Sequence, residues 1–272
     1  MYSAILAGVV DPKGLLGMTE LVPSGATVFS GTAYQILGTD MQILSLAVKP
    51  GEKVLVEQGG MMMMEPGMKG SVSFANWFGR CCGGERCCMD EYVNDEPERP
   101  QMLGLTPNVP AKVIPLQMRQ GDLVRCKKGA FFASTGTVEI GYKYDCNPAR
   151  CCCSGQGCVQ QTVSGEGVGF LSAMGTIMTK KLAEGEVLVV DTNSLVAWDD
   201  TAELGIRRVG GCCTCCCGGE GMFNSTVTGP GTVYFQSMSF ERFKASLAVQ
   251  VTRQAAVGGA AGGVVGGLVS SA

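Results

Sequence analysis

Short apolar runs separated by turn residues recur along the whole chain. Stretches such as VLVEQ (54–58), VGFLSAM (168–174) and TVYFQSM (232–238) are rich in β-branched, aromatic and aliphatic residues, and turn residues such as glycine, proline and aspartate separate them. This pattern is typical of β-strands joined by tight turns. No long amphipathic helical pattern is present, and residues 241–254 provide at most one short helix. The chain is therefore predicted to be all-β.

One longer pattern occurs three times. Each copy has a glycine and an acidic residue, an apolar run, a turn and a second apolar run: PGEKVLVEQGGMMMM (50–64), QGDLVRCKKGAFFAS (120–134) and EGEVLVVDTNSLVAW (184–198). The segments GEGVGFLSAM (165–174) and GPGTVYFQSM (229–238) are 64 residues apart, which is also the distance from Gly121 to Gly185. The first copy has a weaker counterpart of these segments, VPAKVIPLQM (109–118).

Three similar β units in one chain pack most economically around a pseudo-threefold axis, in a sandwich or barrel-like arrangement. Equivalent loops of the three units would then leave the fold on the same face. The expected parts are an N-terminal extension (1–30), a three-repeat β domain (31–243, with repeats at about 34–118, 119–180 and 181–243) and a Gly/Ala-rich C-terminal tail (244–272).

Two segments resemble the family of the altered-inheritance-of-mitochondria protein 24: YQILGTDMQILSLAVKPGEKVLVEQGGMMMMEPG (34–67) and GGEGMFNSTVTGPGTVYFQSM (218–238). The resemblance spans about residues 30–243 and implies a TRAP-like β-sandwich of three repeats with unknown function. Its fungal members imply a role in mitochondrial membrane organisation. The family supplies no catalytic residue, and ligands of the fold's namesake are not transferred because fold does not imply function. The cysteine clusters and the insertion at 90–100 depart from the family pattern.

Composition argues against several classes of function. The net charge of −3 gives no basic surface for phosphates, so we expect no nucleic-acid partner. The chain has no histidine and no nucleophile-elbow motif, so we expect no enzyme. Its first residues, MYSAILAGVVDPKG (1–14), lack both a basic region and a clear small-residue cleavage site. We therefore expect no secretory signal, and an intracellular location.

The candidate site residues are cysteines, because 13 of the 15 fall into three clusters. They are Cys81, Cys82, Cys87 and Cys88; Cys151, Cys152, Cys153 and Cys158; and Cys212, Cys213, Cys215, Cys216 and Cys217. The first cysteine of each cluster follows the glycine of its repeat by 27 to 30 residues. If equivalent loops share a face, the three clusters are neighbours in space.

Four chemical states of these cysteines remain open. S-acylation is favoured, because cytosolic cysteine strings beside apolar or basic residues are typical substrates and several acyl chains anchor a protein stably. Trp77 and Phe78 precede the first cluster, and Arg80, Arg86 and Arg150 are placed to meet anionic headgroups. A shared thiolate cluster for zinc or copper is the alternative. Disulfides are disfavoured by an intracellular location, and buried free thiols would pack as small apolar groups.

The expected function is a non-catalytic scaffold peripheral to an intracellular membrane, either mitochondrial or on the cytosolic face of an organelle. The three cysteine loops would form its anchoring or interaction surface. The expected partner is a membrane surface or a protein assembly, and a homo-oligomer is compatible with both. No cofactor is expected, except zinc or copper under the metal-binding alternative.

Three further features have a structural interpretation. Met61–Met64 suggest copper binding, but they align with the apolar strands of the other repeats, so core packing is predicted. The tail 255–272 has glycine pairs every four residues, which suit helix packing in a bilayer, but a flexible surface tail is favoured. Asp199, Asp200 and Glu203 are predicted to form a solvated turn.

Overall fold

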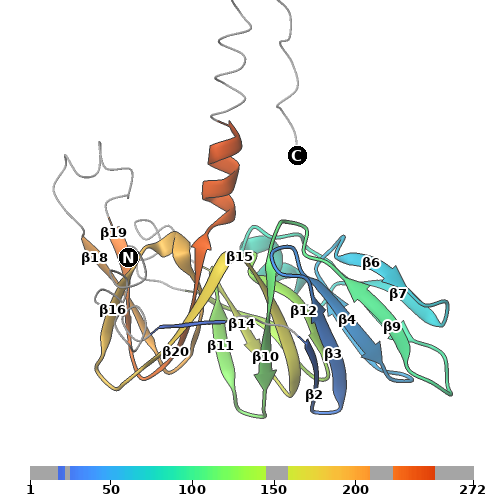
Figure 1. Ribbon diagram of the computed structural model, residues 1–272. Helices are drawn as coiled ribbons and strands as arrows, with labels where there is room; N and C mark the ends of the chain where they lie inside the picture. Colours follow the sequence, from blue (N-terminus) through green and yellow to red (C-terminus); the bar gives the residue numbers. More distant parts are fainter. Residues whose placement is uncertain (1–17, 22–24, 145–158, 209–222, 249–272) are drawn as a thin grey trace, which may run out of the picture.

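The computed structural model describes residues 18–21, 25–144, 159–208 and 223–248 (Figure 1). These residues form an all-β fold, as the sequence pattern predicts. The helical segments among them are α1 (Trp77–Cys82), the 3-10 helix η3 (Thr192–Ser194) and a helix at 240–248. The last of these is the short helix expected near residues 241–254.

The strands form three antiparallel sheets. The largest sheet contains β1 (Thr19–Glu20), β5 (Lys53–Val56), β7 (Met68–Ser73), β8 (Met89–Asn94), β10 (Lys112–Met118), β11 (Leu123–Cys126), β12 (Phe131–Thr135), β13 (Glu139–Tyr144), β14 (Val159–Ser164), β15 (Gly167–Leu182), β17 (Leu195–Asp199) and β20 (Gly231–Met238). The five-stranded sheet contains β2 (Gly25–Phe29), β3 (Thr32–Leu37), β4 (Ile43–Val48), β6 (Met61–Met64) and β9 (Gln101–Leu105). The three-stranded sheet contains β16 (Val187–Val190), β18 (Glu203–Arg208) and β19 (Phe223–Thr228).

The long strand β15 divides the largest sheet into two halves. Its first part pairs with β12 and β10, and its second part pairs with β20 and β1. A register shift between Met174 and Ile177 separates the two parts, and Gly175 there has a φ of +73°. One half has the strand order β7-β8-β5-β12-β15-β10, and the other has the order β13-β14-β11-β17-β20-β15-β1.

The turns that precede β5, β11 and β16 share the same hydrogen bond. In each turn an acidic side chain accepts from the backbone N–H three residues before it. The pairs are Glu52 with Lys49 (3.0 Å), Asp122 with Arg119 (2.9 Å) and Glu186 with Ala183 (2.9 Å). The glycine before each acid has a positive φ, which only glycine adopts readily. The recurring glycine–acid pair of the sequence is therefore a turn signal.

The second strand after each of these turns, β6, β12 or β17, has an irregular pairing. The register shifts between Met61 and Met63 in β6, between Phe131 and Ala133 in β12, and between Leu195 and Ala197 in β17. These residues occupy equivalent positions in the three copies of the sequence pattern. Each copy continues into a strand pair whose connection carries a cysteine cluster: β7–β8, β13–β14 and β18–β19.

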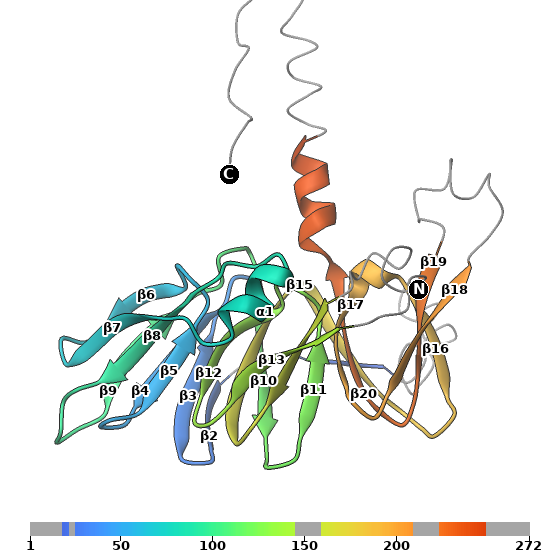
Figure 2. The ribbon, with the colours of Figure 1, turned by 180° about the vertical axis from the view of Figure 1, so that it is seen from behind.

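The closure around a threefold axis that we expected is not seen among the described residues. There β6 pairs with β9 alone and β16 pairs with β19 alone. The two strands lie at opposite ends of the molecule in both views (Figures 1 and 2). The sheets therefore form an open row rather than a closed barrel.

Three apolar clusters fill the interior, one after another along this row. The first contains Leu44, Leu103 and Phe170, whose ring meets Tyr34 edge to face at 5.2 Å. The second is built mainly from β10, β11, β12 and β15, and the third surrounds the fully buried Trp198 of β17. Burial of these side chains supplies the main driving force for folding.

The prediction that Met61–Met64 pack in the core is wrong. These four side chains are 38–52% exposed. The strand at the equivalent position of the second copy, β12, pairs with both β5 and β15 and is buried throughout. Because β6 has a neighbour on one side only among the described residues, its apolar side chains remain at the surface.

The expected domain boundaries remain a prediction. Both β1 and β2 precede residue 31, and the helix at 240–248 runs across residue 243. The tail 255–272 lies outside the described residues. None of the described helices has both the length and the apolar composition needed to cross a bilayer.

Candidate functional site

The first cysteine segment, residues 74–88, connects β7 to β8 and contains α1. It holds four of the candidate site residues: Cys81, Cys82, Cys87 and Cys88. The other candidates lie outside the described residues: Cys151, Cys152, Cys153, Cys158, Cys212, Cys213, Cys215, Cys216 and Cys217. The geometry of a cysteine site can therefore be described for the first cluster.

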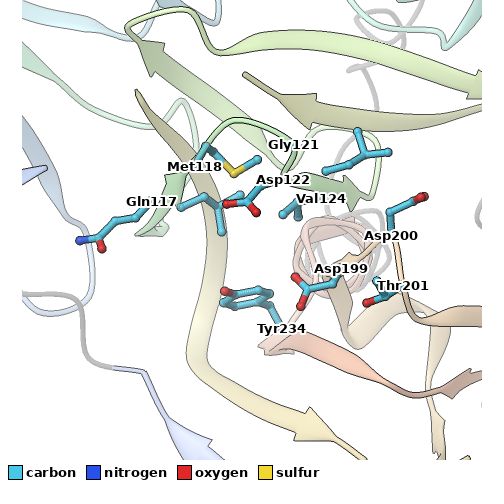
Figure 3. Close-up of a pocket in the computed structure, with 11 residues that line it drawn as sticks. Gln117, Met118, Gly121, Asp122, Val124, Asp199, Asp200, Thr201 and Tyr234 are labelled. Carbon is cyan, nitrogen blue, oxygen red and sulfur yellow. The ribbon is translucent and has the colours of Figure 1, made fainter. Parts of the chain in front are cut away.

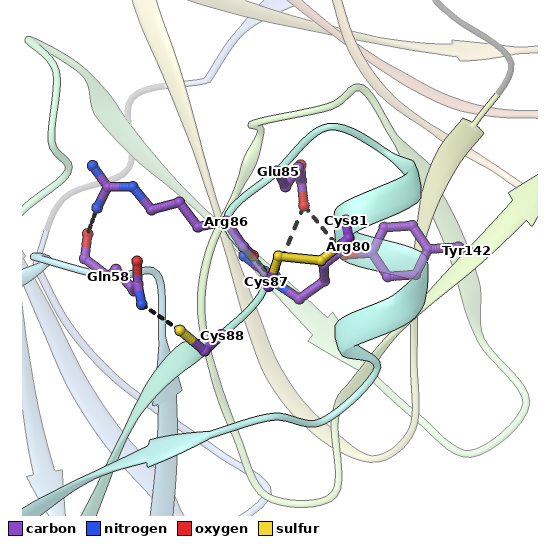
Figure 4. The surroundings of a disulfide bond; sticks show 8 residues. All are labelled: Gln58, Arg80, Cys81, Glu85, Arg86, Cys87, Cys88 and Tyr142. Carbon is purple, nitrogen blue, oxygen red and sulfur yellow. Dashed lines mark hydrogen bonds and ion pairs between the residues drawn. A yellow bond between two sulfur atoms is a disulfide. The ribbon is translucent and has the colours of Figure 1, made fainter. Parts of the chain in front are cut away.

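Cys81 and Cys87 form a disulfide, with an S–S distance of 2.12 Å and Cα atoms 5.0 Å apart (Figure 4). The chain turns back after α1 through Gly83 and Gly84, which brings the two sulfurs together. Disulfide formation, which we disfavoured from the sequence, is thus the state of these two cysteines, and neither offers a free thiol to a lipid or a metal.

The remaining two cysteines of the cluster differ in exposure. Cys82 has an exposed free thiol, whereas Cys88 is half-buried. The side-chain amide of Gln58 donates to the Cys88 Sγ at 2.6 Å. Cys82 is therefore the accessible nucleophile of this cluster.

Arg80 lies beneath the disulfide and is fully buried. Its Nε donates to the carbonyl of Arg86 at 2.8 Å, and its Nη2 donates to Glu57 at 2.6 Å. A second carboxylate, Glu85, lies 3.8 Å from its Nη1. Our expectation that Arg80 meets lipid headgroups is wrong, because α1 directs its side chain into the protein.

Glu85 ties the first cysteine segment to two neighbouring strands and one turn. Its carboxylate accepts from the Tyr142 hydroxyl of β13 (3.2 Å), from the Gln161 side chain of β14 (2.6 Å) and from the Gly129 N–H after β11 (2.9 Å). Burial and the nearby Glu85 charge raise the pKa of Tyr142 and keep its hydroxyl protonated. The segment is thus held by a buried polar network rather than hanging free as a loop.

Cys126 continues this network and belongs to none of the clusters. Its thiol is fully buried and donates to the Gln161 side chain at 3.7 Å. Burial, with a smaller contribution from Glu85, raises the pKa of Cys126. This thiol stays neutral and packs as a small apolar group.

The first cysteine segment lies beside the start of the second. Tyr142, which contacts it through Glu85, is two residues from the end of β13, where the segment with the second cluster begins. The ends of β18 and β19, between which the third cluster lies, are on the same upper side as α1 (Figures 1 and 2). The expected convergence of the three clusters stays a prediction, because clusters two and three lie outside the described residues.

The surface around α1 is aromatic and basic. Phe74, Trp77 and Phe78 are 65%, 55% and 63% exposed, and the last two rings meet edge to face at 5.9 Å. Arg86 in the same segment and Lys128 after β11 are also exposed, with the Lys128 ammonium group against Gly84. We call the three aromatic residues with Cys82, Arg86 and Lys128 the upper surface.

The helix at 240–248 stands on the same side of the molecule (Figures 1 and 2). The Ser239 hydroxyl caps it by accepting from the Arg242 N–H at 3.2 Å, and the Arg242 guanidinium pairs with Asp191 at 2.7 Å. Phe240 and Leu247 are 45% and 48% exposed on it. This helix adds apolar area to the side that carries the upper surface.

A pocket of about 510 Å³ opens between β10, β11, β20 and the turn after β17 (Figure 3). Its acidic residues all have hydrogen-bonding or ionic partners. Asp122 accepts from the Arg119 N–H, Asp199 accepts from the Thr232 N–H, and Asp200 pairs with Arg125 and Lys143. Asp199 ends β17 and Asp200 lies in the turn after it, and both line this pocket; Glu203 is exposed but begins β18.

At the other half of the largest sheet, the place of this pocket is filled. There Thr32 of β3 donates to Glu52 at 3.2 Å and lies 3.2 Å from the Thr135 hydroxyl. Glu52 and Thr135 are the equivalents of Asp122 and Asp199. The pocket is open because β10, unlike β4, has no outer neighbour among the described strands.

No three histidine, cysteine, aspartate or glutamate side chains lie close enough to share a metal ion in the described part of the chain. The sequence interpretation missed the buried Arg80, Glu57 and Glu85. The sequence signal for Arg80 and Glu85 was present in GRCCGGERCC (79–88), where two arginines and an acid interrupt an otherwise small and apolar segment. A charge in such a segment is expected to be either paired or exposed, and only the fold separates the two.

The fold resembles a solved structure. A crystal structure of a protein from Streptococcus pyogenes matches with a TM-score of 0.64 at 22% sequence identity, covering 80% of this chain and 99% of that chain. An uncharacterized protein from Streptococcus pyogenes serotype M6 is 30% identical over 146 residues, which are 53% of this chain and 57% of that protein. The chain thus spans just over half the length of this curated relative.

The family comparison covers most of the β domain. The sequence profile of the family described as "Mitochondrial biogenesis AIM24" matches residues 34–238, from β3 to the end of β20. This confirms the resemblance drawn from the segments 34–67 and 218–238. The chain belongs to the AIM24 family.

Proposed function

We propose that this protein is a non-catalytic scaffold that docks on the surface of an intracellular membrane through its upper surface. The observation that supports this proposal most directly is the exposure of Phe74, Trp77 and Phe78 on one rigidly held segment. Tryptophan and phenylalanine beside basic residues are typical of surfaces that insert into the headgroup region of a bilayer. Arg86 and Lys128 supply the attraction to anionic lipids.

The buried network explains why this surface is suited to docking. Arg80 and Glu85 fix the segment to β13, β14 and the turn after β11, so the aromatic side chains are presented on a preformed support. Preformed presentation reduces the conformational entropy lost on binding. The exposed Cys82 thiol lies on the same helix as Trp77 and Phe78, which makes it the acylation site of this cluster in the proposal.

The scaffold itself consists, in this proposal, of three repeats in an open row. Three observations support it: the shared turn hydrogen bond, the shared register shift, and the shared position of the cysteine-bearing connections. A row of repeats offers successive surfaces for assembly with partners.

Absence of catalysis is part of the proposal. The carboxylates of the pocket accept backbone N–H groups or pair with cations, which are structural tasks. The Cys126 thiol is buried and neutral, so it is unsuited to nucleophilic attack. The family description supports a mitochondrial setting for the scaffold.

Vesicle binding tests the docking surface directly. Trp77 is exposed and Trp198 is fully buried, so insertion of Trp77 into lipid should shift the fluorescence of the full chain to shorter wavelength. We expect this shift with vesicles containing cardiolipin or phosphatidylserine and a weaker one with neutral vesicles. The double variant Trp77→Ala/Phe78→Ala should reduce partitioning onto vesicles, measured by flotation, about tenfold or more. This follows from ~1.5–3 kcal/mol per fully buried aromatic or aliphatic side chain.

The control for this experiment is Val28→Ala, which removes an exposed apolar side chain from β2, away from α1 (Figure 1). It should bind vesicles like the unaltered protein. Equal binding by the double variant and the control, or no binding by the unaltered protein, would overturn the docking proposal.

Intact native mass spectrometry distinguishes the chemical states of the cysteines. Acyl chains add mass that hydroxylamine removes, zinc or copper adds mass that a chelator removes, and disulfides change the mass only on reduction. We expect acylation at Cys82 and a reducible Cys81–Cys87 bond. Bound zinc or copper would replace this proposal with the thiolate metal-binding alternative.

A further inference from the structure

The acid of each glycine–acid turn uses one carboxylate oxygen for the turn itself, which leaves the other for a second donor. In the turn before β5, the second oxygen of Glu52 accepts from the Thr32 hydroxyl at 3.2 Å. In the turn before β16, the second oxygen of Glu186 pairs with the Lys180 ammonium group at 2.7 Å. The same position therefore takes a hydroxyl in one turn and an ammonium group in another.

In the remaining turn, before β11, the acid lines the pocket of about 510 Å³ (Figure 3). One oxygen of Asp122 accepts from the Arg119 N–H at 2.9 Å, and the other has no partner among the described residues. Asp199 lines the same pocket, and one of its oxygens accepts from the Thr232 N–H at 2.7 Å. Its other oxygen also has no partner in the described part of the chain, so both acids can accept from a bound molecule.

The filled half of the largest sheet shows which kind of group occupies this place. Val54 of β5 pairs with Thr135 of β12, and Val124 of β11 pairs with Asp199 of β17, so Thr135 and Asp199 hold the same register position. In the filled half, the Thr32 hydroxyl lies 3.2 Å from the Thr135 hydroxyl. The open pocket thus has a carboxylate where the filled site has a hydroxyl.

This difference indicates the charge of the molecule that fits the pocket. The filled site has one carboxylate, and its occupant is a neutral hydroxyl. The open pocket has two, Asp122 and Asp199, and neither pairs with a cation among the described residues. Asp200, by contrast, pairs with Arg125 and Lys143. Two uncompensated carboxylates in a partly enclosed pocket favour a positively charged donor.

The pocket suits an organic cation better than a metal ion. Calcium takes about six to eight oxygen ligands, whereas no three acidic, cysteine or histidine side chains of the described residues lie close enough to share an ion. The walls include Leu116, Met118 and Leu123, which offer contacts to an alkyl chain. The volume also lies within the range of small-molecule sites, about 300–1,000 Å³.

We propose that this pocket binds a small aliphatic amine, whose ammonium group donates to Asp122 and Asp199 and whose alkyl chain packs on the apolar wall. The Tyr234 ring lies beside Asp199 in the pocket (Figure 3). An aromatic ring near an ammonium group adds a cation–π attraction. The site is a binding function that goes beyond membrane docking.

The position of the pocket identifies the source of the amine. The turn between β10 and β11, which forms part of the pocket wall, is on the opposite side of the molecule from α1 and the helix at 240–248 (Figures 1 and 2). Docking through the upper surface would keep the pocket in water, so the amine is a solute rather than a lipid headgroup. This assignment of the source, unlike the binding itself, rests on the proposed docking.

Isothermal titration calorimetry of the full chain with putrescine tests the site. We expect saturable binding at a single site, and much weaker binding of the neutral diol of the same chain length. Asp199→Asn keeps an oxygen for the Thr232 N–H but removes the charge, so it should weaken binding about tenfold or more, the size of one charge-assisted hydrogen bond. Asp122→Asn is a second variant of the same kind, and circular dichroism checks that both are folded.

The matched control is Glu203→Gln, which removes the same charge from the exposed start of β18, outside the pocket. It should bind putrescine like the unaltered protein. The comparison separates recognition in the pocket from attraction of a cation by the overall negative charge of the chain.

Absence of saturable putrescine binding would overturn the proposal. So would equally tight binding of the diol, or equal losses in Asp199→Asn and Glu203→Gln. Tighter binding of Nα-acetyl-lysine methylamide than of putrescine would contradict a free amine and assign the pocket to a lysine of a partner protein. The variant Trp77→Ala/Phe78→Ala should bind putrescine normally, so failure of this proposal is distinguishable from failure of membrane docking.

Discussion

At the scale of single residues, the molecule depends on charges that are buried and paired. Arg80 is fully buried between Glu57 and Glu85, and these contacts hold the first cysteine segment on the sheet. Burial raises the pKa of Glu57, although the adjacent Arg80 opposes this effect. A paired buried charge tolerates no loss of its partner, because the remaining charge is left without compensation.

Replacing Arg80 should therefore be costly. We expect Arg80→Met to lower the free energy of unfolding by about 3–5 kcal/mol, since Glu57 and Glu85 lose their cation. The matched control is Arg86→Met in the same segment, where an exposed guanidinium donates to the Gln58 carbonyl and the loss should be about 0.5 kcal/mol. Urea denaturation of both variants measures the difference, and equal effects would show that the buried network is not the support of this segment.

Thiol chemistry gives a second prediction at this scale. Cys82 is exposed and Cys126 is buried with a raised pKa, so in folded protein freed of acyl chains by hydroxylamine, iodoacetamide should modify Cys82 and leave Cys126 unmodified. Peptide mass spectrometry before and after denaturation checks this. Rapid native modification of Cys126 would contradict its burial.

The sequence identified the cysteine clusters but not the state of each cysteine. Adjacent cysteines in the first cluster differ in chemical state: Cys81 forms a disulfide, whereas Cys82 is a free thiol at the surface. The burial of Arg80 was likewise invisible, because it depends on the direction in which α1 projects the side chain. Such facts depend on tertiary contacts that no local pattern encodes.

At the scale of elements, the turns before β5, β11 and β16 are the best-predicted features. Glycine was expected as a turn residue, whereas the role of the acid, which accepts the turn's N–H, is seen only in the structure. The strands were also predictable, since apolar runs between turn residues favour them. The exposure of Met61–Met64 was not predictable, because an edge strand and a central strand have similar apolar sequences.

The turn between β15 and β16 predicts a pH dependence. Hydrogen bonds from the Lys180 side chain and then from the Ala183 N–H lower the pKa of Glu186 below its ordinary value of 4.5. A lowered folded-state pKa stabilises the protein above the ordinary value, and this stabilisation is lost as pH falls through the lowered one. We expect Glu186→Gln to be less stable than the unaltered protein at neutral pH, with the difference disappearing as pH falls through the lowered pKa of Glu186.

The measurement is the free energy of unfolding as a function of pH. The neighbouring variant Glu184→Gln serves as the control and should follow the unaltered protein at every pH. A difference between Glu186→Gln and the unaltered protein that grows as pH falls would have the wrong sign for this turn.

At the scale of the whole molecule, a pattern that recurs in the sequence does not determine whether the sheets close into a barrel. The sequence supports three copies of one unit, but closure depends on the rotation between successive units, which follows from strand twist and from the bend in β15. In the described residues β6 and β16 stay apart, so the row is open.

Hydrogen exchange of the full chain with and without cardiolipin-containing vesicles tests the central claim, docking through the upper surface, most directly. The first cysteine segment (74–88) carries the exposed Phe74, Trp77 and Phe78, whereas β2 lies away from α1 (Figure 2). We predict that exchange of the backbone amides of 74–88 slows when vesicles are added, while the amides of β2 are unaffected. Exchange in 74–88 that is independent of vesicles, or protection that appears at β2 instead, would contradict the account.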